Sequence, residues 1–306
     1  MSVFNEEKYV AAAIKSILSQ TYPYFEFIII NDGSTDNSES VIKSFVDERI
    51  VYKKISKVSF SKAINEGIVL AKYDYIARMD ADDISIPDRL EKQVNYIKKN
   101  PGVNVLSCGY ALFKNKKISH IKYLPEKNTE IKKELNYSSA ICHAGSVYSK
   151  RHIEKFGGYN ENLDCLEDID LWLRIREETV FHNLKEALYM IRLKENSMTS
   201  MEARKPKIFF QDIYFKNFKP QYFKSQNAAK AKYAVLLFKF SSVKDFREYS
   251  LREKILFFPE VFLLFLWSFL SSKNILEWLR WKAIGAGTIL GEKKQNLEHI
   301  IKNIED

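Results

Sequence analysis

The chain has 306 residues, 46% of them hydrophobic, so it can bury a substantial core, and a disordered protein is excluded. Its 48 Lys and Arg against 39 Asp and Glu leave a formal charge of +9. That charge favours anionic partners such as nucleotide phosphates, acidic lipids or nucleic acid, without choosing among them. The three cysteines, Cys108, Cys142 and Cys165, form no CxxC pair, which argues against a disulfide framework and a cysteine-based zinc site.

The N-terminal residues 1–7 lack a basic stretch followed by an apolar run, so they do not resemble a secretory signal. The most apolar stretch, residues 255–270, is interrupted by Pro259 and Glu260, whereas a spanning helix needs about 20 largely apolar residues. We therefore expect a cytoplasmic protein without a membrane-spanning helix.

Residues 1–200 alternate predicted helices with predicted strands. In chain order these are a helix at 7–20, a strand at 25–30, a helix that ends near 45, a strand at 51–55, a helix at 60–71, a strand at 74–79, a helix at 89–99 and a strand at 103–107. Such alternation predicts one α/β domain with a mostly parallel sheet covered on both faces. Ligands of such sheets bind at the carboxyl ends of the strands.

Beyond residue 200, Lys and Arg are interleaved with aromatic residues and helical spacing dominates, so residues 201–306 are expected to form a helical C-terminal region. Residues 209–223 and 240–281 combine basic side chains with aromatic rings, a pattern that suits peripheral contact with an anionic membrane at its inner face. A helical lid or a dimer surface with its aromatic rings facing the core explains the same pattern. Both interpretations stay open.

Acidic side chains follow the predicted strand at 74–79. Asp80 and Asp82 lie two residues apart, so in an extended backbone they face the same side, and their hard oxygens suit Mg²⁺ or Mn²⁺. A metal that bridges two phosphates neutralises the charge that develops on a departing nucleoside diphosphate. The alternative is an acidic turn that caps the helix beginning at Asp88 and Arg89.

Two further acids have a functional and a structural interpretation. Asp32 follows an apolar strand and can accept hydrogen bonds from a base or ribose, or it can close an Asx turn before a helix capped by Ser34 or Asp36. Asp168 begins a predicted helix, where it can act as a general base toward an acceptor hydroxyl. Acids in a first helical turn also stabilise the helix dipole, and the residues themselves do not separate the two roles.

Six segments, taken together and in this order, resemble the family 2 glycosyltransferases, which are inverting enzymes with the GT-A fold. The matching segments are residues 1–7 for the opening segment, 31–36 for the nucleotide loop, 62–67 for the next signature, 80–83 for the metal motif, 157–161 for the acceptor-side loop and 167–172 for the catalytic-base helix. Residues 79–89 are most similar to bacterial capsule, exopolysaccharide and O-antigen transferases.

The resemblance implies a role for each matched side chain. Nucleotide contacts would come from Phe4, Asn5, Glu6, Asp32, Asn65, Asp80 and Ala81, metal ligation from Asp82 with Asp80, and acceptor deprotonation from Asp168. It also implies a nucleotide-sugar donor, most commonly a UDP-sugar, and a saccharide or polyprenyl-diphosphate-linked acceptor. The reaction would be a single displacement with inversion at the anomeric carbon.

Two departures from the family pattern bear on the site. The first strand normally begins several residues before the position of Met1, so either the start is truncated or the sheet lacks support beside the nucleotide. Lys194 stands where a late family motif often carries a histidine, and a charged lysine cannot ligate a metal, although it can contact a phosphate.

Three other function classes fit parts of the sequence. A sugar nucleotidyltransferase would carry a glycine-rich phosphate loop near its N-terminus, whereas residues 31–36 contain only Gly33. A nucleic-acid-binding protein could use the basic and aromatic C-terminal region, but that region holds no recognised binding motif, so no nucleic acid is expected. A catalytically inactive scaffold is the third class, and the short first strand is the feature that favours it.

Overall fold

The computed structural model describes residues 1–135, 139–163, 166–194 and 291–305, which belong to one compact unit. The predicted domain boundary at residue 200 and the basic, aromatic stretches 209–223 and 240–281 lie outside the described residues. Within the described ranges, every helix is too short or too polar to cross a bilayer.

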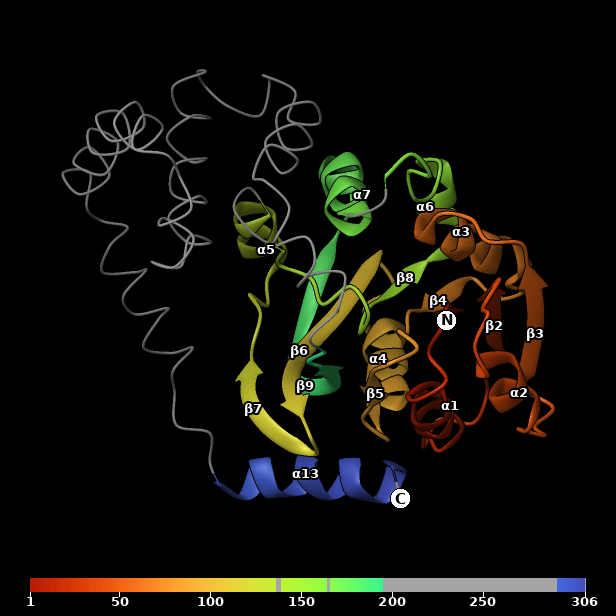
Figure 1. The fold of residues 1–306 in the computed structure, drawn as a ribbon. Coiled ribbons are helices and arrows are strands. Elements are labelled where there is room, and N and C mark those ends of the chain that lie inside the picture. The colour runs from red at the N-terminus through yellow and green to blue at the C-terminus, as the bar shows by residue number, and fades with distance from the viewer. Residues whose placement is uncertain (136–138, 164–165, 195–290, 306) are drawn as a thin grey trace, which may run out of the picture. The chain divides into compact units, whose positions relative to one another are not determined.

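The N-terminal part of the chain forms a parallel sheet with helices on both faces (Figure 1). In the order β1-β2-β3, its strands are Ser2–Val3, Phe27–Asp32 and Ile50–Ile55, and its helices are α1 (Val10–Leu18), α2 (Ser38–Lys43) and α3 (Phe60–Leu70). Alternate residues of β2 face opposite sides. Ile29 packs into the cluster that holds Val10 and Ile14 of α1, whereas Ile30 lies against Gly67 of α3.

A second, mixed sheet follows along the chain. Its strands are β4 (Tyr75–Ala77), β5 (Ile84–Ser85), β6 (Val105–Lys114), β7 (Lys117–Lys122), β8 (Val147–Ser149) and β9 (Phe181–Arg192), in the order β4-β8-β6-β9-β5 with β7 beside β6. The helices between these strands are α4 (Arg89–Lys99), α5 (Asn128–Glu134), α6 (Lys150–Lys155), α7 (Glu167–Ile175) and the 3₁₀ turn η1 (Arg176–Glu178). Only the β6–β9 pair is parallel among the pairs of this sheet in the described residues.

The expected α/β class is confirmed, and the parallel arrangement holds for the first sheet. The second sheet departs from it because β6 and β7 are joined directly rather than through a helix. Asn115 and Lys116 both have positive φ, 50° and 61°, the geometry of a two-residue turn that returns the chain antiparallel.

The last described helix, α13 (Gly291–Glu305), packs against β7 and α1 (Figure 1). Its buried residues Leu297, Ile301 and Ile304 share an apolar cluster with Ile118 of β7. At its end, Glu305 forms an ion pair of 2.6 Å with Arg192 of β9. The helix thus connects the far end of the chain to the strand that leads into the site described next.

Candidate active site

Apart from Asn65, the predicted site residues of the first 82 positions gather at the carboxyl ends of the strands. The chain passes from β1 directly to Phe4, β2 ends at Asp32, and the segment after β4 reaches Asp80. An isolated parallel bridge between Ser2 and Asp80 joins the two sheets at this edge. Both acidic loops therefore lie where a parallel sheet presents its ligands.

Asp32 is a buried carboxylate, 1% exposed, with two partners. Its Oδ1 accepts a hydrogen bond from Val58 N at 2.8 Å, and its Oδ2 forms an ion pair with Lys57 Nζ. The same ammonium lies 4.1 Å from the centre of the Phe4 ring, which is 41% exposed. A cation, an aromatic face and a carboxylate thus meet beside the end of β2, a combination that can hold a base and a ribose.

The turn after β2 does not depend on Asp32. Asn31 Oδ1 accepts from Ser34 N at 3.0 Å, and Asp36 Oδ1 accepts from Ser38 N at 3.0 Å, so these two side chains supply the turn and the helix start. Asp32 is left for contacts outside the turn. The alternative interpretation of Asp32 as an Asx-turn residue is wrong for this chain.

Asn5 and Glu6 join the segment after β1 to the loop after β2. Asn5 has φ of 54°, its N donates to Ser34 Oγ at 3.1 Å, and its Oδ1 accepts from Thr35 N at 2.8 Å. Glu6 N donates to Ser38 Oγ at 2.8 Å. These contacts explain why α1 begins at Val10 rather than at the predicted residue 7, because residues 5 and 6 are held by the neighbouring loop.

Asp80 is held from two sides. Its Oδ1 forms a 2.7 Å ion pair with Arg78 NH1, and its backbone N donates to the hydroxyl of Tyr189 at 3.0 Å. The neighbouring Ala81 is buried. Because the Asp80 side chain is 30% exposed, one face of the carboxylate remains open to a ligand.

Asp82 also has a cationic partner. Its Oδ2 lies 2.7 Å from Lys194 Nζ, and the same ammonium lies 2.6 Å from Glu6 Oε1. Burial raises the pKa of Glu6, Lys194 works against that rise, and Asp82 adds to it. The backbone of this loop is fixed by Arg192, whose Nε donates to the Asp82 carbonyl at 2.7 Å.

The predicted metal site does not fit this arrangement. Each of the proposed ligands, Asp80 and Asp82, already faces a cationic side chain, and the described residues contain no group of three His, Cys, Asp or Glu that could hold an ion. The alternative role as a helix cap does not apply either, since α4 is preceded by Asp88 as its N-cap residue. The structure therefore places these carboxylates in ion pairs with Arg78 and Lys194.

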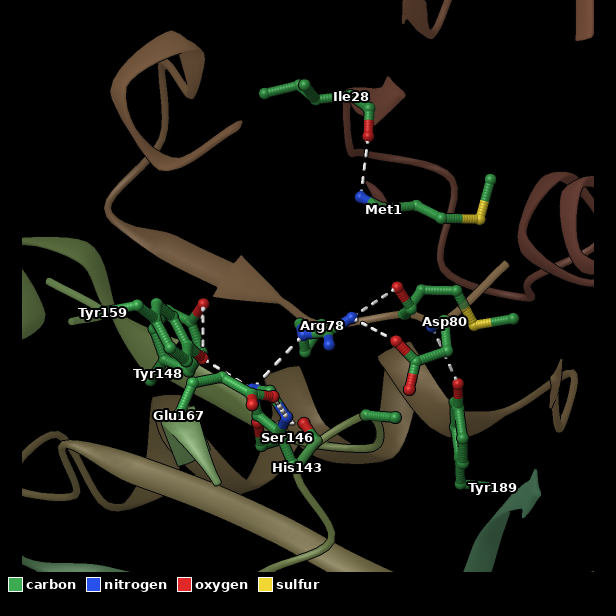
Figure 2. Close-up of polar contacts among 12 residues, drawn as sticks. Met1, Ile28, Arg78, Asp80, His143, Ser146, Tyr148, Tyr159, Glu167 and Tyr189 are labelled. Atoms are coloured by element: carbon green, nitrogen blue, oxygen red, sulfur yellow. Dashed lines mark hydrogen bonds and ion pairs between the residues drawn. The ribbon is translucent and has the colours of Figure 1, made fainter. Parts of the chain in front are cut away.

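A buried polar network connects Asp80 to the start of α7 (Figure 2). Arg78 is 4% exposed, and its Nε lies 3.3 Å from His143 Nε2. Burial and the charge of Arg78 hold the pKa of His143 well below its usual range, so the ring is neutral. Since an arginine can only donate, Nε2 accepts and the ring proton sits on Nδ1, which lies 3.8 Å from Glu167 Oε1. The Tyr159 hydroxyl lies 2.8 Å from the same Nε2.

Asp168 and Glu167 form a pair of acids at the first turn of α7. Burial raises the pKa of Asp168 to about 6, with the charge of Arg78 working against the rise. Burial and the neighbouring Asp168 raise the pKa of Glu167 to about 8. At neutral pH, Asp168 is therefore mostly ionised and Glu167 mostly protonated. A carboxylate whose pKa lies just below neutral is well suited to accept a proton at physiological pH.

Asn65 is placed against the predicted acceptor-side loop rather than beside Asp32. Its Oδ1 accepts from Tyr159 N at 2.9 Å, and its Nδ2 donates to the Tyr159 carbonyl at 2.9 Å and to Glu161 Oε1 at 3.1 Å. Gly158, with φ of 69°, passes so close that a Cβ there would lie 2.8 Å from Asn65 Oδ1. The nucleotide contact expected of Asn65 stays a prediction, and its observed contacts fix the loop onto α3.

The cationic and neutral partners of these acids were not predicted as site residues. Lys57, Arg78, His143 and Arg192 each contact a predicted acid or the network behind it. The one available signal was that Arg78 sits two positions before Asp80, where alternation in an extended chain places both side chains on the same side. The others come from distant positions along the chain.

Comparison with known proteins agrees with this geometry. The family model described as "Glycosyl transferase family 2" matches residues 1–157, which is more than half of the chain. The chain belongs to glycosyl transferase family 2. The B. subtilis "putative glycosyltransferase EpsE" is 33% identical over 63% of this chain and 71% of its own. The Escherichia coli "O-antigen biosynthesis glycosyltransferase WbnJ" is 36% identical over 64% of this chain and 79% of its own.

Solved structures share the fold of this glycosyltransferase. S. aureus TarS 1–349, in complex with UDP-GlcNAc, matches with a TM-score of 0.62 and 16% identity, covering 86% of this chain and 77% of TarS 1–349. The mannosyltransferase PcManGT from Pyrobaculum calidifontis, in complex with GDP-Man and Mn²⁺, matches with a TM-score of 0.57 and 13% identity, covering 99% of this chain and 84% of its own. The expected GT-A fold is confirmed.

Proposed function

We propose that this glycosyltransferase transfers a sugar from a nucleoside diphosphate sugar to a hydroxyl of a saccharide or polyprenyl-diphosphate-linked acceptor. The preferred donor is a UDP-sugar, and the reaction is a step in the synthesis of a cell-surface polysaccharide. The observation that carries the proposal is the position of Asp168 in the first turn of α7, next to Glu167, which the Arg78 network connects to Asp80 at the strand ends. The family match also decides for a transferase over a sugar nucleotidyltransferase.

The names of related proteins support the choice of substrates. WbnJ is named for O-antigen biosynthesis, and a relative from Erwinia amylovora, 28% identical, is named an amylovoran biosynthesis glycosyltransferase. TarS has been crystallised with UDP and with UDP-GlcNAc, whereas PcManGT was crystallised with GDP-Man. A uridine nucleotide is therefore the first donor to test and a guanosine nucleotide the second.

In the proposed reaction, the acceptor oxygen attacks the anomeric carbon while its proton passes to Asp168. The bond between that carbon and the diphosphate oxygen breaks on the opposite face, so the product is inverted and a nucleoside diphosphate leaves. Phe4, Asn5, Glu6 and Asp32 border the nucleotide, with Asp80 and Ala81 beside its ribose and phosphates. Asp82 and Asp80, which the family resemblance assigns to Mg²⁺ or Mn²⁺, have cationic partners here, so no step is assigned to a metal.

The alanine variant of Asp32 tests the donor site. We expect UDP to raise the melting temperature of the wild-type protein, because a ligand that binds the folded state stabilises it. Asp32→Ala should weaken UDP binding about tenfold, since a charge-assisted hydrogen bond contributes roughly 1.5 kcal/mol. Asp47→Ala is the matched control. The Asp47 carboxylate pairs with Arg49 just before β3 begins, so it lies at the amino end of the parallel sheet, whereas Asp32 lies at the carboxyl end. The donor assignment is refuted if neither UDP nor GDP stabilises the wild type.

The pH dependence of transfer tests the role of Asp168. The base must be ionised, and because burial raises its pKa to about 6, kcat/KM should fall as the pH is lowered through about 6 and level off above it. With an aspartate of ordinary pKa, this fall in kcat/KM would occur about two pH units lower. Initial rates measured between pH 4.5 and 7.5 at subsaturating acceptor give the pH at which kcat/KM falls. A fall centred near pH 4 would contradict the assignment of Asp168.

A further inference from the structure

Lys194 occupies the position between the opening segment and the acidic loop. It follows β9, and its ammonium lies 2.6 Å from Glu6 Oε1 and 2.7 Å from Asp82 Oδ2. The three side chains are 19%, 20% and 22% exposed respectively, so the cluster is enclosed but reachable from solvent. The Tyr9 ring lies beneath the ammonium at 5.4 Å and limits its movement.

Lys194 pairs with two carboxylates at once, those of Glu6 and Asp82. The other acids of the loop have separate partners: Asp80 pairs with Arg78, and Asp83 Oδ1 accepts from Arg192 N at 2.8 Å. In the part of the chain that the structure describes, Lys194 is therefore the cation that pairs with both Glu6 and Asp82.

The ammonium has donors left for a ligand. A lysine ammonium carries three N–H groups, and the oxygens of Glu6 and Asp82 account for two of them. A third N–H can reach a phosphate oxygen without either ion pair being given up. A divalent ion on either carboxylate oxygen of Asp82, by contrast, would lie close to the Lys194 ammonium and would be repelled by it.

We infer that Lys194 takes the place of a divalent metal at the donor site and contacts the diphosphate of the bound nucleotide, so that nucleotide binding is independent of metal. The inference rests on the proposed function, because it supposes a nucleoside diphosphate donor. An ammonium beside the diphosphate opposes the charge that develops as the nucleoside diphosphate leaves, which is the service that a metal ion provides elsewhere.

Calorimetric titration with UDP and with GDP tests the inference directly. The 306-residue chain is treated with EDTA, desalted, and titrated in EDTA and then in Mn²⁺ or Mg²⁺. The expected result is binding in EDTA, with a Kd that changes less than about twofold on adding metal, since independent sites have no coupling free energy. Binding that requires metal overturns the inference and leaves the proposed function standing. Absence of binding under all conditions overturns both.

Two substitutions separate the ammonium from the rest of the site. Lys194→Ala should weaken UDP binding in EDTA about 10- to 100-fold, the range expected for a lost hydrogen bond to a charged group. Lys194→His should lose binding in EDTA and regain it with Mn²⁺, because a neutral imidazole with Asp82 can ligate the metal. EDTA-resistant binding by Lys194→His at the wild-type Kd would show that the ammonium is not required.

Lys92→Ala is the matched control for these variants. Lys92 also bridges two carboxylates, at 2.8 Å from Asp88 and 2.5 Å from Glu186, but its partners lie outside the site. We expect its nucleotide affinity to equal that of the wild type with and without metal. Melting temperatures of all variants confirm folding, and the gain of Mn²⁺ dependence in Lys194→His is an effect that a merely structural role for the lysine would not produce.

Discussion

Replacement of Asp168 by asparagine is expected to lower kcat about a thousandfold, because a positioned general base contributes typically 10²- to 10⁴-fold to a proton-transfer step. The amide has nearly the same size and still fits the first turn of α7, but it cannot accept the proton of the acceptor hydroxyl. The Kd for UDP should stay within about twofold, since the base acts on the acceptor and not on the donor. Single-turnover transfer assays and calorimetry measure the two quantities on the same preparation.

The adjacent Glu167 provides the matched control. Its pKa of about 8 means that it is mostly protonated at neutral pH, so glutamine copies its prevailing state in shape and charge. Glu167→Gln should therefore retain most of the activity. Its transfer rate should also no longer respond to the ionisation of residue 167 near pH 8. Equal losses in the two amide variants would contradict the assignment of Asp168 as the base, and would point to the α7 terminus acting as one unit.

Arg78→Met is expected to destabilise the fold by about 3 kcal/mol, the lower end of the range for removing one partner of a buried ion pair. The lower end applies because the partner carboxylate of Asp80 is 30% exposed and can regain water, whereas Arg78 itself is 4% exposed. The substitution also removes the donors to the Met79 carbonyl and to His143 Nε2. Urea unfolding followed by circular dichroism gives the free energy of unfolding.

The same variant should lose transfer activity beyond its loss of stability. Without the guanidinium, the side chain that joins Asp80 to His143 is lost, so the Asp80 side and the α7 side of the site lose their common support. Arg151→Met is the control, because Arg151 forms an ion pair with Asp74 in which the side chains are 81% and 61% exposed. Its free energy of unfolding should change by less than about 0.5 kcal/mol. A comparably small change in Arg78→Met would show that the network is dispensable.

Elements with a complete local signal were predictable from the sequence. The helix at Arg89–Lys99 has apolar residues at helical spacing and is followed by Pro101, and the structure gives it the predicted bounds. The strand predicted at 103–107 instead runs over Val105–Lys114, because β9 pairs along Val105–Phe113 and β7 pairs with its second half. Hydrogen bonds to strands that lie far away in the chain leave no mark on the local pattern.

The acids of the site were predictable, but their partners were not. Asp32, Asp80, Asp82 and Asp168 stand in recognisable segments, and alternation places the first three at the ends of strands. A chain with 48 Lys and Arg offers many candidates for each cation, and only the fold selects Lys57, Arg78 and Lys194. Metal ligation by Asp80 and Asp82 stays a prediction, and the local sequence does not show that Arg78 and Lys194 pair with these two carboxylates.

Helix α13 has a consequence for the order in which the protein folds during synthesis. Helix α13 begins at residue 291, which is synthesised about 100 residues after Arg192. Arg192 is the strand residue that Glu305, in the last turn of α13, pairs with. Until then, the apolar side chains of β7 lack the contribution of Leu297 and Ile301, and the Asp82 loop lacks the Arg192–Glu305 pair behind it. The apolar cluster around β7 and the support of the Asp82 loop are therefore completed only after α13 has been synthesised.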